Sequence, residues 1–166
     1  MDTRERDRHC YEPKPVKVLF VGESLAAGGT FFYYADSILY KYIQEAFSEV
    51  FGPNCGRGLQ FLEFFKGLGL YLDDLCLEPV NHMSRSKRRE KRREGVPSLA
   101  KRLESMMPLK VVVLMRGIES EVRDAIKQAD LSVSVNSVPF PSYGHQKRFA
   151  RELGEILLAL QTERII

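Results

Sequence analysis

Glu23 is an isolated carboxylate that follows a strand-like apolar segment, Val16–Val21, and one glycine. Near-continuous apolar segments of this length are typical of buried strands in a parallel sheet. In open α/β sheets, ligands bind beyond the carboxyl ends of the strands, so a reactive carboxylate is expected at this point. The small residues of Ala26–Gly29 would let a ligand approach the backbone, and the aromatic residues of Phe31–Tyr34 offer flat faces for a planar ring. The alternative is an ordinary turn with a solvated Glu23 and aromatic side chains in the core.

A second loop with unusual residues, Pro139–Gln146, follows the last expected strand. Its two prolines, Pro139 and Pro141, favour an extended backbone, and Ser142 can cap the following helix or bind a phosphate. Parallel strands bring their carboxyl ends to one edge of the sheet, so we expect this loop and the loop after Gly22 to face each other across one cleft. A rigid connector without a ligand is the alternative.

The segment 84–95 is strongly basic, with seven Lys or Arg and two Glu within Arg85–Glu94. We expect these cations to contact nucleic-acid phosphates, because releasing counterions from the phosphates gives salt-dependent affinity. Since like charges repel and bury little surface, this loop is predicted to be poorly ordered without nucleic acid. A solvated surface segment is the alternative. The candidate phosphate-binding residues are Arg85, Lys87, Arg88, Arg89, Lys91, Arg92 and Arg93.

The elements that would position these residues alternate between strands and helices. Four apolar segments read as strands, and five segments have apolar residues at helical spacing. This alternation predicts a three-layer α/β/α sandwich with a mainly parallel, roughly four-stranded sheet, in one domain over 16–166 that follows a polar lead-in at 1–15. The expected strands are Val16–Val21, Tyr71–Pro79, Val111–Met115 and Val133–Val138, and the expected helices are Asp36–Phe51, Leu59–Leu68, Pro97–Met107, Glu119–Ala129 and Gln146–Leu160.

The composition fits one globular domain, with 166 residues, 44% hydrophobic and 28% charged residues and a net charge of +3. No apolar run reaches membrane-spanning length, and the charged first residues do not resemble a secretory signal. Cys10, Cys55 and Cys76 lack C-x-x-C spacing, which argues against a disulfide framework and an iron–sulfur site. We therefore expect a cytoplasmic protein without a metal or cofactor.

Three segments together resemble the uracil-DNA glycosylase superfamily. Gly22-Glu23-Ser24 after an apolar strand resembles its first motif, and Phe140-Pro141-Ser142 before a terminal helix resembles its second motif, usually His-Pro-Ser. Leu109–Gly117 is similar to the penultimate strand of that family and its glycine turn. The resemblance covers residues 16–160 in the expected order. It implies the α/β/α fold of that family and base-excision activity in DNA repair, on DNA that contains uracil or another deaminated base.

The mechanism of the family assigns roles to several residues of this chain. A base is flipped out of the stack into a pocket, and the N-glycosidic bond breaks through an oxocarbenium-like transition state. By resemblance, Glu23 orients the attacking water, and replacing it by Gln is expected to slow excision and leave DNA binding largely intact. Phe32 is the stacking ring, with Phe31 as the alternative. Asp74 reads the base edge, and Asn81 is a possible substitute.

The chain departs from the family pattern at Phe140, where the family usually has histidine. Phenylalanine cannot donate to a developing base anion, so backbone N–H groups or His145, five residues on, would have to compensate. We expect Phe140 to line the base pocket beside Phe32, with Ser142 at the catalytic edge. The family's proline is also missing from Leu25-Ala26-Ala27.

Two other functions remain open from the sequence. Phe140 and Asp74 favour a non-catalytic nucleic-acid-binding protein of the same fold. A hydrolase acting on free nucleosides or nucleotides is the third possibility, and it would make the basic segment incidental. For the leading interpretation the expected partner is uracil-containing or single-stranded DNA, bound by a monomer.

Overall fold

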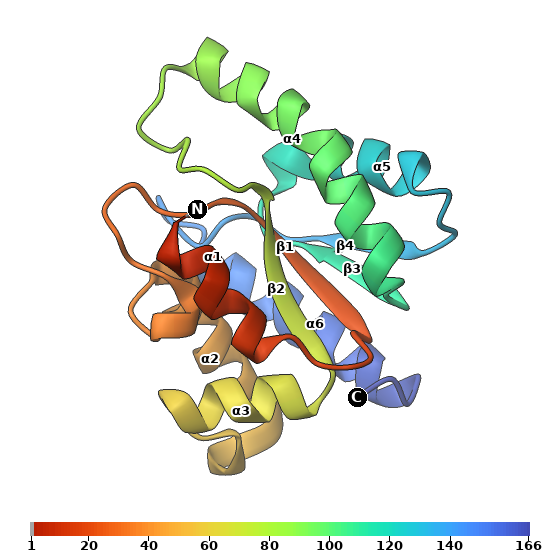
Figure 1. The fold of residues 1–166 in the computed structure, drawn as a ribbon. Coiled ribbons are helices and arrows are strands. Elements are labelled where there is room, and N and C mark those ends of the chain that lie inside the picture. The colour runs from red at the N-terminus through yellow and green to blue at the C-terminus, as the bar shows by residue number, and fades with distance from the viewer. Residues whose placement is uncertain (1) are drawn as a thin grey trace.

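Four parallel strands form one sheet in the order β2-β1-β3-β4, in a computed structural model that describes residues 2–166 (Figure 1). The two central strands are buried along almost their whole length, because helices cover both faces of the sheet. The predicted three-layer α/β/α sandwich is confirmed. The strands are β1 (Val18–Ser24), β2 (Leu70–Cys76), β3 (Lys110–Val113) and β4 (Ser134–Ser137).

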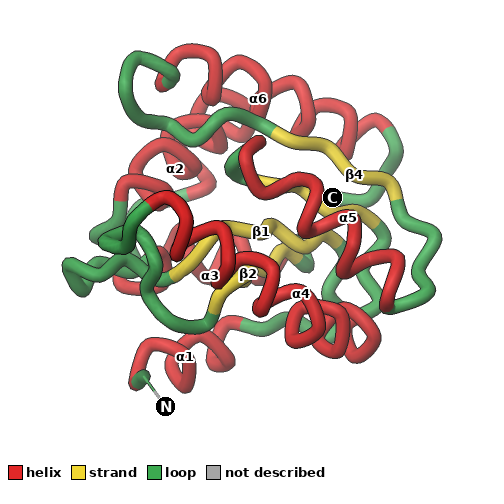
Figure 2. The backbone as a smooth tube through the Cα atoms, turned by 90° about the horizontal axis from the view of Figure 1, so that it is seen from above, coloured by secondary structure: helices red, strands yellow, loops and turns green. Residues whose placement is uncertain are grey.

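The helices divide between the two faces of the sheet, as Figure 2 shows in a view from above. The chain moves from β1 to β2 in one direction and then returns past β1 to β3. Because crossovers between parallel strands are right-handed, this reversal places the connecting helices on opposite faces. One face carries α2 (Ile38–Phe51), α3 (Leu59–Gly67) and α6 (Gln146–Thr162), and the other carries α4 (Arg85–Met106) and α5 (Glu119–Gln128).

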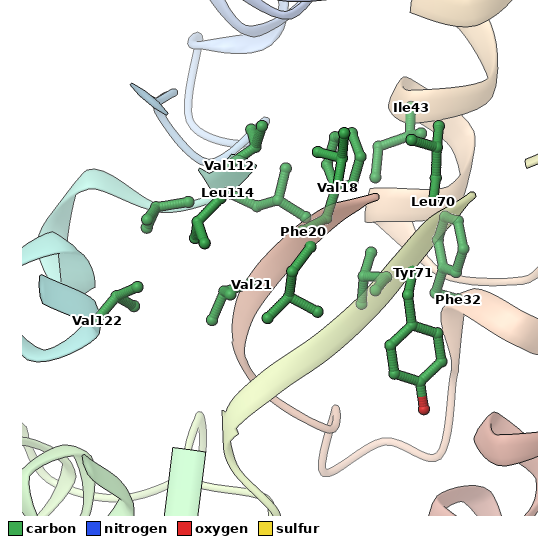
Figure 3. Close-up of a cluster of buried hydrophobic side chains, with 14 of the residues drawn as sticks. Val18, Phe20, Val21, Phe32, Ile43, Leu70, Tyr71, Val112, Leu114 and Val122 are labelled. Atoms are coloured by element: carbon green, nitrogen blue, oxygen red, sulfur yellow. The ribbon is translucent and has the colours of Figure 1, made fainter. Parts of the chain in front are cut away.

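The core on the α2 side is rich in aromatic rings. Figure 3 shows two of these residues, Phe20 and Phe32, among buried aliphatic side chains. Phe65 lies 5.4 Å from Phe20 and 5.3 Å from Phe32, measured between ring centroids. Phe47 and Phe61 pack beside them at 5.4 Å from each other. The helical spacing of Phe61 and Phe65 therefore serves packing, as expected from the sequence.

The basic segment is the first half of helix α4, so the prediction of a poorly ordered loop at 84–95 is wrong. Acidic side chains offset the repulsion, since Lys87 pairs with Glu90 at 3.0 Å and Lys91 pairs with Glu94 at 2.9 Å. The second half of α4 buries Val96, Leu99, Ala100 and Leu103 against the sheet and α5, which anchors the whole helix.

Gly95 lets α4 approach β2 closely. A Cβ atom at this position would lie 2.6 Å from the carbonyl oxygen of Leu75, which is too short for any real contact. Gly95 stands between the basic half and the apolar half of the helix. It therefore fixes where the basic half projects beyond the carboxyl edge of the sheet, as Figure 1 shows.

The N-terminal segment is more than the expected polar lead-in. It forms α1 (Thr3–Arg8), capped by Asp2, whose carboxylate accepts from the backbone N–H of Arg4 at 2.9 Å. Helix α1 lies beside the outer edge of β2 and buries Arg8. Within residues 2–166, no helix is both long and apolar enough to cross a membrane.

Candidate functional site

Glu23 lies near the carboxyl end of β1 and is only 9% exposed, because two arginines of α4 cover it. Arg88 donates from Nε to Glu23 Oε1 at 2.7 Å and from Nη2 to Oε2. Arg92 donates from Nε to the same Oε1. Glu23, Arg88 and Arg92 form what we call the rim cluster. Both carboxylate oxygens are engaged, so the alternative of a solvated Glu23 in an ordinary turn is wrong.

The fold dictates this meeting of β1 and α4. Arg88 and Arg92 are four residues apart on one helix and therefore share a face. The order of the strands reverses between β1 and β3, and ligands of open α/β sheets bind beyond such a point. Arg92 reaches across it, with Nη1 3.4 Å from the carbonyl oxygen of Gly117 in the turn after β3. The rim cluster thus covers the position where the topology places a ligand.

The charge of Glu23 changes the ionisation of its neighbours. Hydrogen bonding to Glu23 raises the pKa of Arg88 above its ordinary value. Burial, with the nearby Glu23 charge adding to it, raises the pKa of the Cys76 thiol to about 12. Cys76 is therefore protonated near neutral pH and unsuited to act as a nucleophile. With one carboxylate against two guanidinium groups, the rim cluster carries a net charge of +1.

A basic groove of about 850 Å³ lies next to the rim cluster, between α4 and the turn after β3. Among the described residues, no carboxylate pairs with Arg85, Arg89 or Arg93 of this groove within 4.0 Å. Unpaired arginines on one helix face are typical of a surface that binds phosphates. The groove is lined by Arg85, Ser86, Arg89, Glu90, Arg92, Arg93, Glu94 and Gly117.

The loops after β1 and β2 are tied together at the same edge. Ala27 donates its backbone N–H to Asn81 Oδ1 at 2.9 Å, and Val80 donates to Ser24 Oγ at 3.3 Å. Asn81 is exposed, but its carbonyl oxygen is occupied by this contact. Its amide nitrogen remains the group that a ligand at the rim would meet.

Asp74 belongs to a second group of charges, away from the rim. Arg8 donates to Asp73 Oδ1 at 2.9 Å, to Asp74 Oδ2 at 2.7 Å and to Glu5 Oε1 at 2.7 Å. Arg102 of α4 pairs with Asp73. We call these five residues, Arg8, Glu5, Asp73, Asp74 and Arg102, the interior cluster. Asp74 is 4% exposed and its Oδ2 accepts from Arg8, so in this structure it is not open to a base.

Burial dominates the ionisation of the interior cluster. It raises the pKa values of Asp74 and Glu5, although Arg8 opposes the change. Burial also disfavours charge on Arg8, but its three carboxylate partners outweigh that effect and raise the pKa of Arg8. Gly22 makes room for this arrangement, since a Cβ there would lie 2.5 Å from Asp74 Oδ1.

The predicted stacking rings are packed inside the protein. Phe32 is 3% exposed and contacts the rings of Tyr33, Tyr40 and Phe65. Phe31 is also 3% exposed, and the guanidinium of Arg8 lies 5.4 Å from its ring centroid. In this structure neither ring offers an open face to a flipped base, which corrects the expectation for both.

The loop after β4 presents different residues from those expected. Phe140 is half-buried, His145 is exposed, and the Phe32 ring has other neighbours than Phe140. Ser142 does not cap α6, because a turn with left-handed backbone at Tyr143 and Gly144 intervenes and His145 precedes the helix. Tyr143, which the sequence analysis missed, is 97% exposed at the tip of this turn.

Comparison with known protein families finds none that matches this chain, and comparison with curated proteins finds no matching protein. Across residues 2–166, no three His, Cys, Asp or Glu side chains gather in an arrangement that could hold a metal ion. The chemistry open to this edge of the sheet is therefore judged from three features: one carboxylate, its arginines and the adjoining basic groove.

Proposed function

We propose that this protein is a DNA glycosylase that hydrolyses the N-glycosidic bond of uracil or another deaminated base. The observation that carries the proposal is the rim cluster: a shielded carboxylate at the carboxyl end of β1, bordered by a basic helix. A carboxylate there can stabilise the oxocarbenium-like sugar and orient the attacking water, while the arginines neutralise phosphates of the bound DNA. We include cytoplasmic location and DNA as the partner in the same proposal.

The exposed aromatic residue Tyr143 supports a nucleic-acid substrate. Aromatic side chains at a basic surface stack on unpaired bases, and each stacked base is worth roughly 1–3 kcal/mol. Tyr143 lies in the loop after β4, at the same carboxyl edge of the sheet as the rim cluster, so a strand bound at this edge would meet both. His145, exposed just before α6, has a ring N–H that can donate to a leaving base.

A non-catalytic nucleic-acid-binding protein is the second candidate. The enclosed rings of Phe31 and Phe32 and the sealed Asp74 favour it, because they leave no open base pocket in the free protein. A nucleoside hydrolase gains no such support, since a free nucleoside has no use for the basic groove.

One assay separates the candidates. Single-stranded oligonucleotides with one uracil, hypoxanthine or xanthine are incubated with the protein and then heated in alkali, which cleaves abasic sites. We expect cleavage with wild type and a drop of about 10²–10³-fold with Glu23→Gln, the effect of losing one preorganised charge-stabilising group. A mobility shift without cleavage by either protein would support the binding protein instead. Release of uracil from free deoxyuridine would indicate the nucleoside hydrolase.

A further inference from the structure

Arg88 and Arg92 direct their N–H donors at an anion that the protein itself supplies. Arg88 presents Nε and Nη2 to the two oxygens of Glu23, and Arg92 presents Nε to one of them. A planar fork of N–H donors facing two oxygens is the way in which arginine binds a phosphate group. Glu23 therefore occupies the place that two phosphate oxygens would fill.

The surroundings favour exchange of this internal anion for an external one. The side chains of Arg88 and Arg92 are 30% and 17% exposed, so solvent reaches them, while that of Glu23 is 8% exposed. The cluster keeps an excess positive charge, and the adjoining groove adds Arg85, Arg89 and Arg93. A polyanion that enters the groove meets a positive field on its way to Arg88 and Arg92.

We propose that Arg88 and Arg92 form a phosphate-binding site that Glu23 fills in the free protein, so that a nucleic-acid phosphate displaces Glu23 and exposes its carboxylate. The inference rests on the proposed function, because the phosphate belongs to the strand on which Glu23 would act. Binding and exposure then form one equilibrium. By linkage, an anion that competes with Glu23 binds more tightly when Glu23 is made neutral.

This differs from the sequence-based expectation that Glu23→Gln leaves DNA binding largely intact. In the neutral variant, Arg88 and Arg92 no longer have a charged internal partner, and the phosphate does not have to displace one. Weaker excision and tighter binding are therefore expected from the same substitution.

The test measures binding of a fluorescent single-stranded oligonucleotide with ordinary bases to the full chain, at fixed salt. Glu23→Gln is compared with wild type and with Glu163→Gln. Glu163 is a matched control because it pairs with Lys110 at 3.0 Å outside the basic groove, so its loss also removes one negative charge and frees one cation. We expect at least about fivefold tighter binding for Glu23→Gln. Glu163→Gln should bind the oligonucleotide with an affinity close to that of wild type. Equal affinities of the two variants would overturn the proposal.

A second comparison assigns the effect to the two arginines. Glu23→Gln is introduced into an Arg88→Gln/Arg92→Gln background, where the gain in affinity should vanish. If Glu23→Gln still raises the affinity in this background, the effect of Glu23 is long-range and the proposed phosphate-binding site at Arg88 and Arg92 is refuted. Urea unfolding of each variant verifies that folded proteins are compared.

The source of the phosphate is tested with pyrophosphate in the same titrations. Tighter binding of the oligonucleotide by Glu23→Gln than by wild type supports a nucleic-acid strand as the ligand. Tighter binding of pyrophosphate alone would refute that assignment. Because the oligonucleotide holds no base to be excised, an absence of glycosylase activity would leave this result standing. The excision assay in turn tests the proposed function by itself.

Discussion

The interior cluster and the rim cluster are made from the same kinds of group but differ in their access to water. In the interior cluster, the side chains of Arg8, Asp73 and Asp74 are 1%, 3% and 6% exposed, and solvent reaches only its outer members, Glu5 at 11% and Arg102 at 21%. In the rim cluster, Arg88 and Arg92 are 30% and 17% exposed. An arginine that water reaches can change its partner, whereas an arginine sealed among carboxylates cannot do so without a large desolvation cost.

The net charges of the two clusters also have opposite signs. Three carboxylates face two guanidinium groups in the interior cluster, which leaves one excess negative charge if all are ionised. The rim cluster has one excess positive charge. Helix α4 contributes to both, through Arg102 at one end and Arg88 and Arg92 at the other. Helix α4 is therefore fixed at its buried end and open to anions at its exposed end.

Removal of Arg8 should produce the largest effect. Arg8→Ala leaves Asp73 and Asp74 buried without their main partner, so we expect the free energy of unfolding to fall by about 3–5 kcal/mol. Urea unfolding followed by circular dichroism measures the loss. Arg6→Ala is the control on the same helix, because its side chain is 74% exposed, and it should change stability by at most about 0.5 kcal/mol. Similar losses for both would contradict a special role for the interior cluster.

Removal of the rim arginines should affect binding more than stability. For Arg88→Gln/Arg92→Gln we expect a loss of unfolding free energy of about 1–2 kcal/mol, because Glu23 lies close enough to the surface to be rehydrated. The slope of log affinity for a single strand against log salt should become shallower by about 1.4, which corresponds to two lost phosphate contacts.

Two exposed lysines, Lys101 and Lys127, provide a control for the loss of positive charge alone. Lys101→Gln/Lys127→Gln removes the same total charge away from the basic groove. It should leave the salt slope close to that of wild type. An equal change of slope in both double variants would show that net charge, and not the rim cluster, governs binding.

Gly95 tests whether the fixed position of α4 matters to both clusters. In Gly95→Ala the added Cβ would meet the Leu75 carbonyl oxygen at 2.6 Å, so α4 must move, and we expect a loss of about 1–3 kcal/mol. Gly154 of α6 has open space at its Cβ position, so Gly154→Ala should stabilise by roughly 0.5–1 kcal/mol. Thermal or urea unfolding compares the two. Stabilisation by Gly95→Ala would mean that α4 is not held tightly against β2.

The sequence predicts the sheet because strand-length apolar segments alternate with helical spacing over most of the chain. It also places Glu23 correctly at the end of β1, since topology alone brings the carboxyl ends of parallel strands to one edge. The basic segment was harder to predict. Its charge density argues for disorder, but three features explain an ordered helix: the anchoring by Val96, Leu99 and Leu103, the Lys–Glu pairs within the helix, and Glu23 of β1.

The aromatic and acidic positions show where sequence reasoning fails. The identity of Phe31 or Asp74 does not reveal that the side chain is covered, because Arg8 of α1 contacts both and the amphipathic pattern of this six-residue helix is too short to detect. Arg8 carries the only available signal, an (i, i+3) spacing to Glu5, and such spacing is equally common on solvated helices. Tyr143 could have been found from its position before glycine in a tight turn.

The smallest effect concerns the excess negative charge of the interior cluster. Burial raises the pKa of Glu5 above its ordinary 4.5, with Asp73 and Asp74 adding to the rise and Arg8 opposing it. The folded protein therefore holds this proton more firmly than the unfolded chain does. The resulting stability is fully present below pH 4.5 and is lost as the pH rises through the raised pKa.

Glu5→Gln removes this dependence but keeps a carbonyl oxygen for Arg8. Between pH 4 and pH 7, the free energy of unfolding of wild type should therefore fall relative to the variant, by less than the limit of about 1.4 kcal/mol per pH unit for one proton. Urea unfolding of both proteins at several pH values measures the difference. Parallel curves would show that Glu5 does not take up a proton on folding and that the interior cluster tolerates three charged carboxylates.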